Sequence, residues 1–146
     1  LARVAAAEAS FTRPSASLLM IGRREKRSHN SWMHNHASIQ QPEAPALLMH
    51  PRDAHARGID ADAMVRISGN GHSFEVPVEI TENVQAGVVA LPHGWGHQHS
   101  GLTRAKALGG GNVNALLPGG LSQLEPVSGQ AIMLGHPVEV EPTSGS

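Results

Sequence analysis

The chain has 146 residues, a length that suits one domain with its own buried core. Its formal net charge of −1 argues against binding to DNA or to a membrane surface through overall charge. The absence of cysteine excludes disulfides, thiolate zinc sites and cysteine-ligated iron–sulfur clusters within this chain, and no apolar run of about 18 residues could span a membrane.

Glycine and proline, at 16 and 10 residues, predict many turns and short strands rather than a helical bundle. We expect residues 1–17 to be a linker, residues 18–141 a β domain and residues 142–146 a tail. The sequence starts at Leu1 rather than at methionine and ends in EPTSGS, so we expect it to be part of a longer protein.

The β domain is expected to open with two short apolar strands. Leu18–Ile21 and Ala46–His50 are predicted as buried strands, and the basic, Asn/His-rich segment 22–36 as the loop after the first one. Pro51 is a favoured first residue of a helix and Gly58 a favoured stop. A helix of about two turns is therefore expected between them.

A β-hairpin is predicted next along the chain. Val65 and Ile67 mark its first strand, and GNG at 69–71 is a strong hairpin turn signal. The partner strand Ser73–Ile80 alternates apolar and polar residues. Because Pro77 cannot donate a backbone hydrogen bond, we expect this partner strand to lie at a sheet edge or to contain a bulge.

The remaining strands are short and separated by glycine-rich loops. Val88–Pro92 is predicted as a buried strand, followed by a Gly/His-rich loop over 93–101. The last strands are expected at Ala131–Leu134 and His136–Glu141. Several short strands with little helix predict a small β-barrel or β-sandwich.

Histidines gather in two parts of the sequence, and imidazoles at such spacing can bind zinc or copper. Neither group lies on a predicted helix, and no neighbouring carboxylate or cysteine completes a ligand shell. We therefore expect solvated or hydrogen-bonding histidines and no metal site. The two groups are His29, His34 and His36, and His93, His97 and His99.

The basic run Arg23–Arg27 holds four of the eleven Lys and Arg residues. With asparagines and Trp32 nearby, it could grip a nucleic-acid strand by charge and stacking. The near-neutral chain favours a small anionic ligand instead, so no nucleic-acid partner is expected. A stand-alone β-barrel module that binds a nucleotide or nucleic acid without redox activity is the alternative.

Three segments combine glycine with asparagine, histidine or arginine after an apolar strand: GRREKRSHNSWMHN, PHGWGH and GGGNVN. Glycine-bounded loops expose backbone N–H groups that bind phosphate together with arginine. Asparagine pairs with the amide-like edges of a purine or pterin. Three such loops in one small β domain indicate a phosphorylated, heteroatom-rich ligand, and no catalytic constellation accompanies them.

These segments, in this order, resemble the C-terminal domain of the molybdopterin oxidoreductases, the dimethylsulfoxide reductase and formate dehydrogenase family. LLMIGRREKRSHNSWMHN is similar to the first strand and cofactor loop, in the form of the thiosulfate reductase and acetylene hydratase-like branch. MHPRDAHARGIDADAMVRI, VPVEITENVQAGVVALPHGWGH, GGGNVNALL and LEPVSGQAIMLGHPVEV are similar to later signature segments. The resemblance runs from about Leu18 to Glu141.

The resemblance implies a mainly β fold with short helices, a double-psi β-barrel that covers one face of a molybdopterin guanine dinucleotide cofactor carrying Mo or W. It also implies that other domains of a parent oxidoreductase, formate dehydrogenase- or thiosulfate reductase-like, share this cofactor. Those domains are the expected partners, and no direct membrane contact is expected. Because the family's metal ligand lies in another domain, this chain is not expected to be active alone.

Carried over by position, the resemblance assigns arginine to phosphate, asparagine and histidine to pterin heteroatoms, and glycine to close approach. Asn112 and Asp53 are further candidates, although Asp53 is also placed to cap the predicted helix. The implied cofactor-binding residues are Arg23, Arg24, Arg27, Ser28, His29, Asn30, Ser31, His93, Gly94, Trp95 and Asn114.

Overall fold

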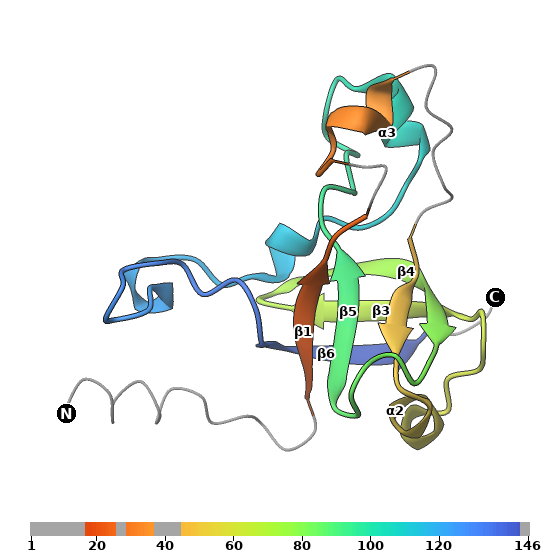
Figure 1. The fold of residues 1–146 in the computed structure, drawn as a ribbon. Coiled ribbons are helices and arrows are strands. Elements are labelled where there is room, and N and C mark those ends of the chain that lie inside the picture. Colours follow the sequence, from red (N-terminus) through yellow and green to blue (C-terminus); the bar gives the residue numbers. More distant parts are fainter. Residues whose placement is uncertain (1–16, 26–28, 37–44, 144–146) are drawn as a thin grey trace.

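The computed structural model of the chain describes residues 17–25, 29–36 and 45–143. Six strands form a closed barrel, in the order β1-β5-β2-β4-β3-β6 around its wall (Figure 1). The mainly β fold with short helices is therefore confirmed. The strands are β1 (Leu18–Arg23), β2 (Leu47–Met49), β3 (Met64–Gly69), β4 (His72–Ile80), β5 (Val88–Pro92) and β6 (His136–Pro142). The helices are η1 (Trp32–Asn35), α2 (Pro51–Arg57), α3 (Thr103–Ala107), η2 (Val113–Leu116) and η3 (Leu121–Gln123).

Parallel strand pairs decide where the loops of the barrel gather. β1 runs parallel to β5, with Gly22 opposite Leu91 and Arg23 opposite Pro92, and β2 runs parallel to β4. The carboxyl ends of β1 and β5 therefore lie side by side, and the loops that leave them begin at the same end of the barrel. Figure 1 shows η1 and α3 beyond this end and α2 at the opposite end.

Alternating apolar side chains fill the barrel interior, as the strand pattern predicts. Val65 and Ile67 of β3 are 0% exposed, and Val76 and Val78 of β4 are 1% exposed. Glu75, which lies between apolar positions of β4, faces solvent. Each of these aliphatic side chains contributes about 1.5–3 kcal/mol by leaving water. The hydrophobic alternation thus holds the strands around one core.

Helix α2 begins and ends where Pro51 and Gly58 predict. The His50 ring accepts a hydrogen bond from the Arg52 N–H at 3.1 Å, and this caps the first turn. Gly58 follows the helix in the left-handed conformation, with φ 62°, which glycine adopts at little cost. None of the described helices is long and apolar enough to cross a membrane.

β4, which holds Pro77, is not an edge strand and contains no bulge, contrary to the prediction, because it pairs with β3 in a continuous register on one side and with β2 on the other. Among the described strands, however, Pro77 lies just before the pairing with β2 begins, so β4 is unpaired on that side at this position. Pro77 faces Met64, and Val78 donates its N–H to the Ala63 carbonyl at 2.9 Å. The Pro77 nitrogen therefore points away from β3, and β2 pairs with β4 only from Val78 onward. Proline is tolerated here because neither ladder needs its missing N–H.

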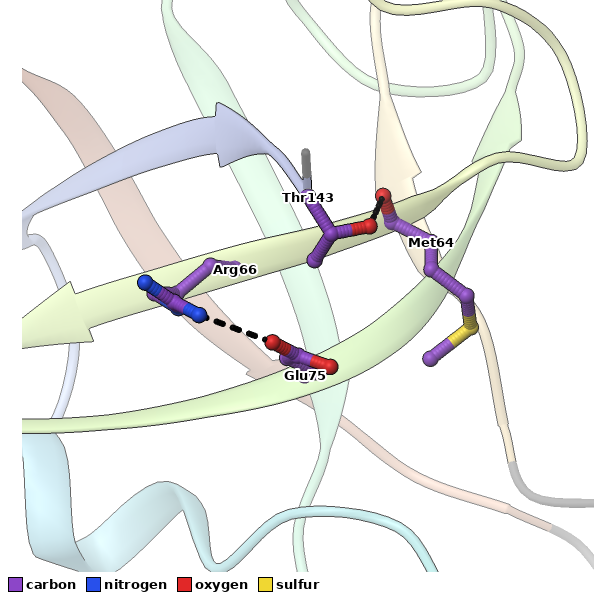
Figure 2. Close-up of polar contacts among 4 residues, drawn as sticks. All are labelled: Met64, Arg66, Glu75 and Thr143. Carbon is purple, nitrogen blue, oxygen red and sulfur yellow. Dashed lines mark hydrogen bonds and ion pairs between the residues drawn. The ribbon is translucent and has the colours of Figure 1, made fainter. Parts of the chain in front are cut away.

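The barrel closes between β3 and β6 at the end of the described chain. The Thr143 hydroxyl donates to the Met64 carbonyl at 2.8 Å (Figure 2). The Thr143 N–H donates to the same oxygen at 3.2 Å. On the outer face, Arg66 and Glu75 form a cross-strand ion pair at 3.0 Å. Because water screens this exposed pair, it contributes less than about 1 kcal/mol.

The predicted strand Ala131–Leu134 is wrong. Of this segment, Ala131 alone forms a β-bridge, with Leu124. Residues 118–135 form an arm that projects from the barrel (Figure 1). The apolar residues of this segment predicted a buried strand. In the structure the arm folds back on itself, and the one bridge of Ala131 is to Leu124 of the arm and not to a strand of the barrel. The last barrel strand is β6 alone.

Candidate functional site

A cleft of about 450 Å³ opens where the loops after β1 and β5 meet. A third segment, at the start of η2, completes its wall. None of the described lining residues is acidic, and one is an arginine. They are Arg24, Asn30, Ser31, His93, Gly94, Trp95, Gly96, His97, Asn112 and Asn114.

Glycine lets the three segments approach at two contact points. Gly94 has φ +89°, and a Cβ on it would overlap the Asn30 carbonyl group. Gly96 has φ +76°, and a Cβ on it would overlap the Asn112 backbone nitrogen. The Gly96 N–H also donates to the Gly109 carbonyl at 3.3 Å. The loop after β5 is therefore held between the other two by backbone contact that any side chain would prevent.

Arg24, Asn30 and His93 form a polar triangle in the cleft wall. Arg24 Nη1 donates to Asn30 Oδ1 at 2.5 Å, and His93 Nε2 lies 2.7 Å from the same oxygen. Because Asn30 Oδ1 only accepts, His93 Nε2 must carry the proton that joins them. The 3.1 Å approach of Arg24 Nη1 to His93 Nε2 is then a contact between two donors. Asn30 thus orients both neighbouring side chains.

Arg24 supplies the cleft with a cationic side chain. Among the residues that the structure describes, Arg24 makes no ion pair, whereas its neighbour Arg23 pairs with Glu25 at 3.1 Å. A guanidinium that has no carboxylate partner among the described residues suits a phosphate. The arrangement can therefore hold an anionic ligand rich in hydrogen-bonding atoms.

The structure brings most of the predicted site residues together and leaves two of them outside the cleft. Arg23 donates to the Ala46 carbonyl at 3.4 Å and does not line it. His29 packs edge-on against exposed Trp32, with ring centroids 6.2 Å apart. Arg27 and Ser28 lie outside the described residues. Those that line the cleft are Arg24, Asn30, Ser31, His93, Gly94, Trp95 and Asn114.

The two further candidates, Asn112 and Asp53, lie at opposite ends of the barrel. Asn112 lines the cleft, and its Oδ1 accepts a hydrogen bond from the Asn114 N–H at 3.1 Å. Asp53 lies on α2, at the other end of the barrel, where its Oδ2 accepts from the Gly87 N–H at 2.6 Å. This contact ties α2 to the turn before β5, so Asp53 has a structural partner away from the cleft.

Gly96 and His97 also line the cleft; both lie in the PHGWGH segment that the sequence predicted to help bind a phosphorylated ligand, but neither was among the individual residues assigned to the cofactor. His97 Nε2 donates to the Gly94 carbonyl at 2.9 Å and thereby closes the loop on itself. The Gly-Trp-Gly-His order within HGWGH was the available signal, and both of its glycines take positive φ. The histidine spacing alone indicated His97 only as a possible metal ligand.

His34 is the buried polar residue beneath the cleft, at 1% exposed. Its ring packs on Trp95 at 4.2 Å and edge-on to His97 at 5.9 Å, between ring centroids. Among described residues, neither His34 ring nitrogen nor Trp95 Nε1 finds a hydrogen-bond partner. Burial, with His97 as the smaller cause, lowers the pKa of His34 and keeps its ring neutral.

No metal centre emerges from these histidines. Within residues 17–25, 29–36 and 45–143, no three His, Asp or Glu side chains gather in an arrangement that could hold a metal ion. His93 and His97 instead contact Asn30 and the Gly94 carbonyl, respectively. In the described part of the chain, both histidines therefore act as hydrogen-bonding groups of the cleft wall.

A second hollow, of about 410 Å³, lies between the β3–β4 hairpin and β6. Its described lining includes Ser68, Ser73, His72 and Glu139 but neither lysine nor arginine. An acidic residue without a fixed cation makes this hollow less suited to a phosphorylated ligand. The anion-binding chemistry therefore points to the cleft at the ends of β1 and β5.

The chain matches a family model described as "Molydopterin dinucleotide binding domain" over residues 18–132. Among curated proteins it is 40% identical over 50 residues to the G subunit of NADH-quinone oxidoreductase from Salmonella typhimurium and from Salmonella typhi. That match covers 34% of this chain and 6% of the relative.

The fold is similar to that of acetylene hydratase from Pelobacter acetylenicus, with a TM-score of 0.61 and 17% identity. This match covers 86% of the chain and 18% of the acetylene hydratase chain. The sequence thus spans only a small part of the proteins that it matches, and at this identity the structural likeness concerns the fold.

Proposed function

We propose, because the chain belongs to the family of molybdopterin dinucleotide-binding domains, that the cleft at the carboxyl ends of β1 and β5 is where this domain holds its cofactor. When bound, the cofactor supplies the redox chemistry of its metal and dithiolene. The residues of this chain bind and orient it.

The observation that carries this proposal is the meeting of three loops around Arg24 in a cleft whose described lining contains no acid. Arg24 would hold a phosphate, and Asn30 and His93 would hydrogen-bond to heteroatoms of the pterin or base. Gly94 lets the loop after β5 pack against the Asn30 carbonyl, so that His93 and Asn30 share one wall of the cleft. The donors therefore fit a phosphorylated pterin.

The proposal extends to the form of the cofactor and the kind of parent protein. We expect the guanine dinucleotide form of the cofactor, with Mo or W, shared with other domains of a formate dehydrogenase- or thiosulfate reductase-like protein. The parallel pairs β1/β5 and β2/β4 within a closed six-stranded barrel support the double-psi arrangement. Since the described cleft is an open wall and not an enclosed cavity, the remaining contacts would come from those domains.

The test is a residue-resolved NMR titration of the chain with guanosine diphosphate, with Zn²⁺ in parallel. We expect saturable shifts at Arg24, Asn30, His93, Trp95 and Asn114. Arg24→Gln should weaken guanosine diphosphate binding about tenfold, because it removes a charge-assisted hydrogen bond.

Arg66→Gln is the matched control, since Arg66 lies on the outer face of β3 and pairs with Glu75. It should leave the affinity unchanged. Equal weakening by both substitutions would show unspecific charge attraction and contradict the proposal. Shifts caused by Zn²⁺ alone at His93 and His97 would also contradict it.

A further inference from the structure

The arm, residues 118–135, exposes apolar side chains to an unusual degree. Five of the eight large exposed hydrophobic residues of the described chain lie on it. Scattered exposed apolar residues are ordinary, but a cluster of large ones on one projecting segment marks a contact surface. The five are Leu121 (86% exposed), Leu124 (36%), Val127 (73%), Met133 (59%) and Leu134 (56%).

The arm has a fixed shape, because backbone hydrogen bonds connect its two sides. Glu125 N–H donates to the Gln130 carbonyl at 2.7 Å, and Ile132 N–H donates to the Gln123 carbonyl at 2.9 Å. At its base, Gly135 N–H donates to the Met20 carbonyl at 2.8 Å, which ties the arm to β1. Its apolar side chains are therefore presented on a preformed scaffold.

The arm is also almost without charge. Glu125 is its single charged residue, and the carboxylate accepts from the Val127 N–H at 3.0 Å and from the Ser128 N–H at 2.6 Å. These bonds, above all those with Ser128, lower the pKa of Glu125. The one charge of the arm is thus engaged in the turn, and the rest of its exposed surface consists of large apolar residues and uncharged polar ones such as Ser128 and Gln130.

The arm stands beside the proposed cofactor cleft. Leu134 lies next to Gly22 of β1, at 3.8 Å from the position of a Cβ on that glycine. The chain continues from Gly22 through Arg23 to Arg24 of the cleft wall. The base of the arm and the wall of the cleft therefore contact the same short segment, Gly22 to Arg24.

We propose that the arm docks on an uncharged, apolar surface of another domain of the same polypeptide, the one that completes the cofactor cleft. Both kinds of matched protein are much longer than the region they share with this chain, which covers 18% of acetylene hydratase and 6% of the NADH-quinone oxidoreductase relative. The choice of docking partner rests on the proposed function, because it assumes that another domain shares the cofactor.

Methionine oxidation tests the docking directly. Met133 of the arm and Met64 of β3 are 59% and 46% exposed, while Met20 and Met49 are buried. Hydrogen peroxide oxidises exposed methionines, and peptide mass spectrometry gives the rate at each site. The measurement compares the 146-residue chain with the polypeptide purified from its natural host.

In the 146-residue chain, Met133 and Met64 should oxidise at similar rates. In the natural polypeptide, Met133 should oxidise about tenfold more slowly, because docking removes it from solvent, while Met64 keeps its rate. Equal rates for Met133 in both samples would overturn the proposal. Equal protection of both methionines would overturn the assignment of the contact to the arm.

A second copy of the chain is the competing occupant. If Met133 is protected in the 146-residue chain at high concentration and exposed on dilution, the arm is a self-association surface and the proposal is wrong. The double variant Leu121→Asp, Val127→Asp separates docking from folding. It should restore Met133 oxidation in the natural polypeptide and leave the Tm of the 146-residue chain within about 2 °C.

The Mo and W content of the natural polypeptide keeps the two proposals distinguishable. If the natural polypeptide contains Mo or W but its Met133 is not protected from oxidation, the docking proposal is wrong and the proposed function stands. A protected Met133 in a polypeptide that binds neither metal nor guanosine diphosphate would overturn the proposed function.

Discussion

Single glycines determine how closely the loops of the cleft meet. Gly94 and Gly71 both have positive φ, at +89° and +76°. At Gly94 an added Cβ would overlap the Asn30 carbonyl, whereas at Gly71 nothing lies within 4 Å. The pair therefore separates the cost of the backbone conformation from the cost of a steric clash.

We predict that Gly71→Ala lowers the free energy of unfolding by about 1 kcal/mol, through the left-handed conformation alone. Gly94→Ala should cost about 3 kcal/mol, because the clash is added. Urea unfolding of the two variants checks this difference. Equal losses would show that the loops after β1 and β5 are not in contact.

His34 makes stability depend on pH through its buried, neutral ring. Burial lowers its pKa below the ordinary value of 6.5. The unfolded chain therefore binds a proton on His34 at a higher pH than the folded chain does. As pH falls from 6.5 toward the lower folded-state pKa, the unfolded state gains protons and the free energy of unfolding decreases.

His34→Gln should remove this part of the pH dependence, because glutamine does not titrate. Urea unfolding at about pH 7.5 and about pH 5.5 should show a smaller loss for His34→Gln than for the unsubstituted chain. His72→Gln, at an exposed position of β4, should keep the full loss. If His34→Gln and the unsubstituted chain lose the same free energy, His34 is not buried in its neutral form.

At the scale of elements, Asp53 connects α2 to the turn before β5 and lies far from the cleft. Asp53→Ala removes the acceptor for the Gly87 N–H, a 2.6 Å hydrogen bond to a charged group. We predict a loss of about 1–3 kcal/mol in the free energy of unfolding. The guanosine diphosphate titration should remain unchanged, since the cleft stands at the other end of the barrel.

Asp60→Ala is the control, because Asp60 is exposed after α2. Its unfolding free energy should stay within about 0.5 kcal/mol of the original. Loss of guanosine diphosphate binding in Asp53→Ala, with the fold intact by NMR, would return Asp53 to the cofactor site.

At the scale of the whole molecule, the cleft is open, and Arg24, the one cationic side chain of its described lining, lies in one wall. We predict that the chain alone binds guanosine diphosphate weakly, with a Kd of about 0.1–1 mM, because an open cleft with one described arginine makes few contacts to offset the cost of association. The NMR titration gives this value directly. Micromolar or tighter binding would mean that the cleft needs no other domain, and would favour the stand-alone nucleotide-binding module.

Local sequence patterns correctly predicted those helices and strands that form from the properties of a few neighbouring residues. The alternation of Val76 and Val78 with polar neighbours predicted β4, and Pro51 with Gly58 predicted α2, because side-chain periodicity and backbone preference act over a few residues. The same reasoning placed Pro77 at an edge. It was wrong about the strand, because β4 has a neighbour on each side in the closed barrel, and the position at which the pairing with β2 begins, one residue after Pro77, is set by the barrel and not by the local sequence.

The sequence by itself determined the strand pattern, the glycine-rich loops and, through the order of their motifs, the family to which the chain belongs. Only the tertiary structure decided which loop residues share a cleft, because the parallel pairing of β1 with β5 brings Arg24 and His93 together across a long stretch of chain. It also decided that Ala131–Leu134 stays outside the core, since an apolar segment becomes a buried strand only where a neighbouring strand is free to pair with it.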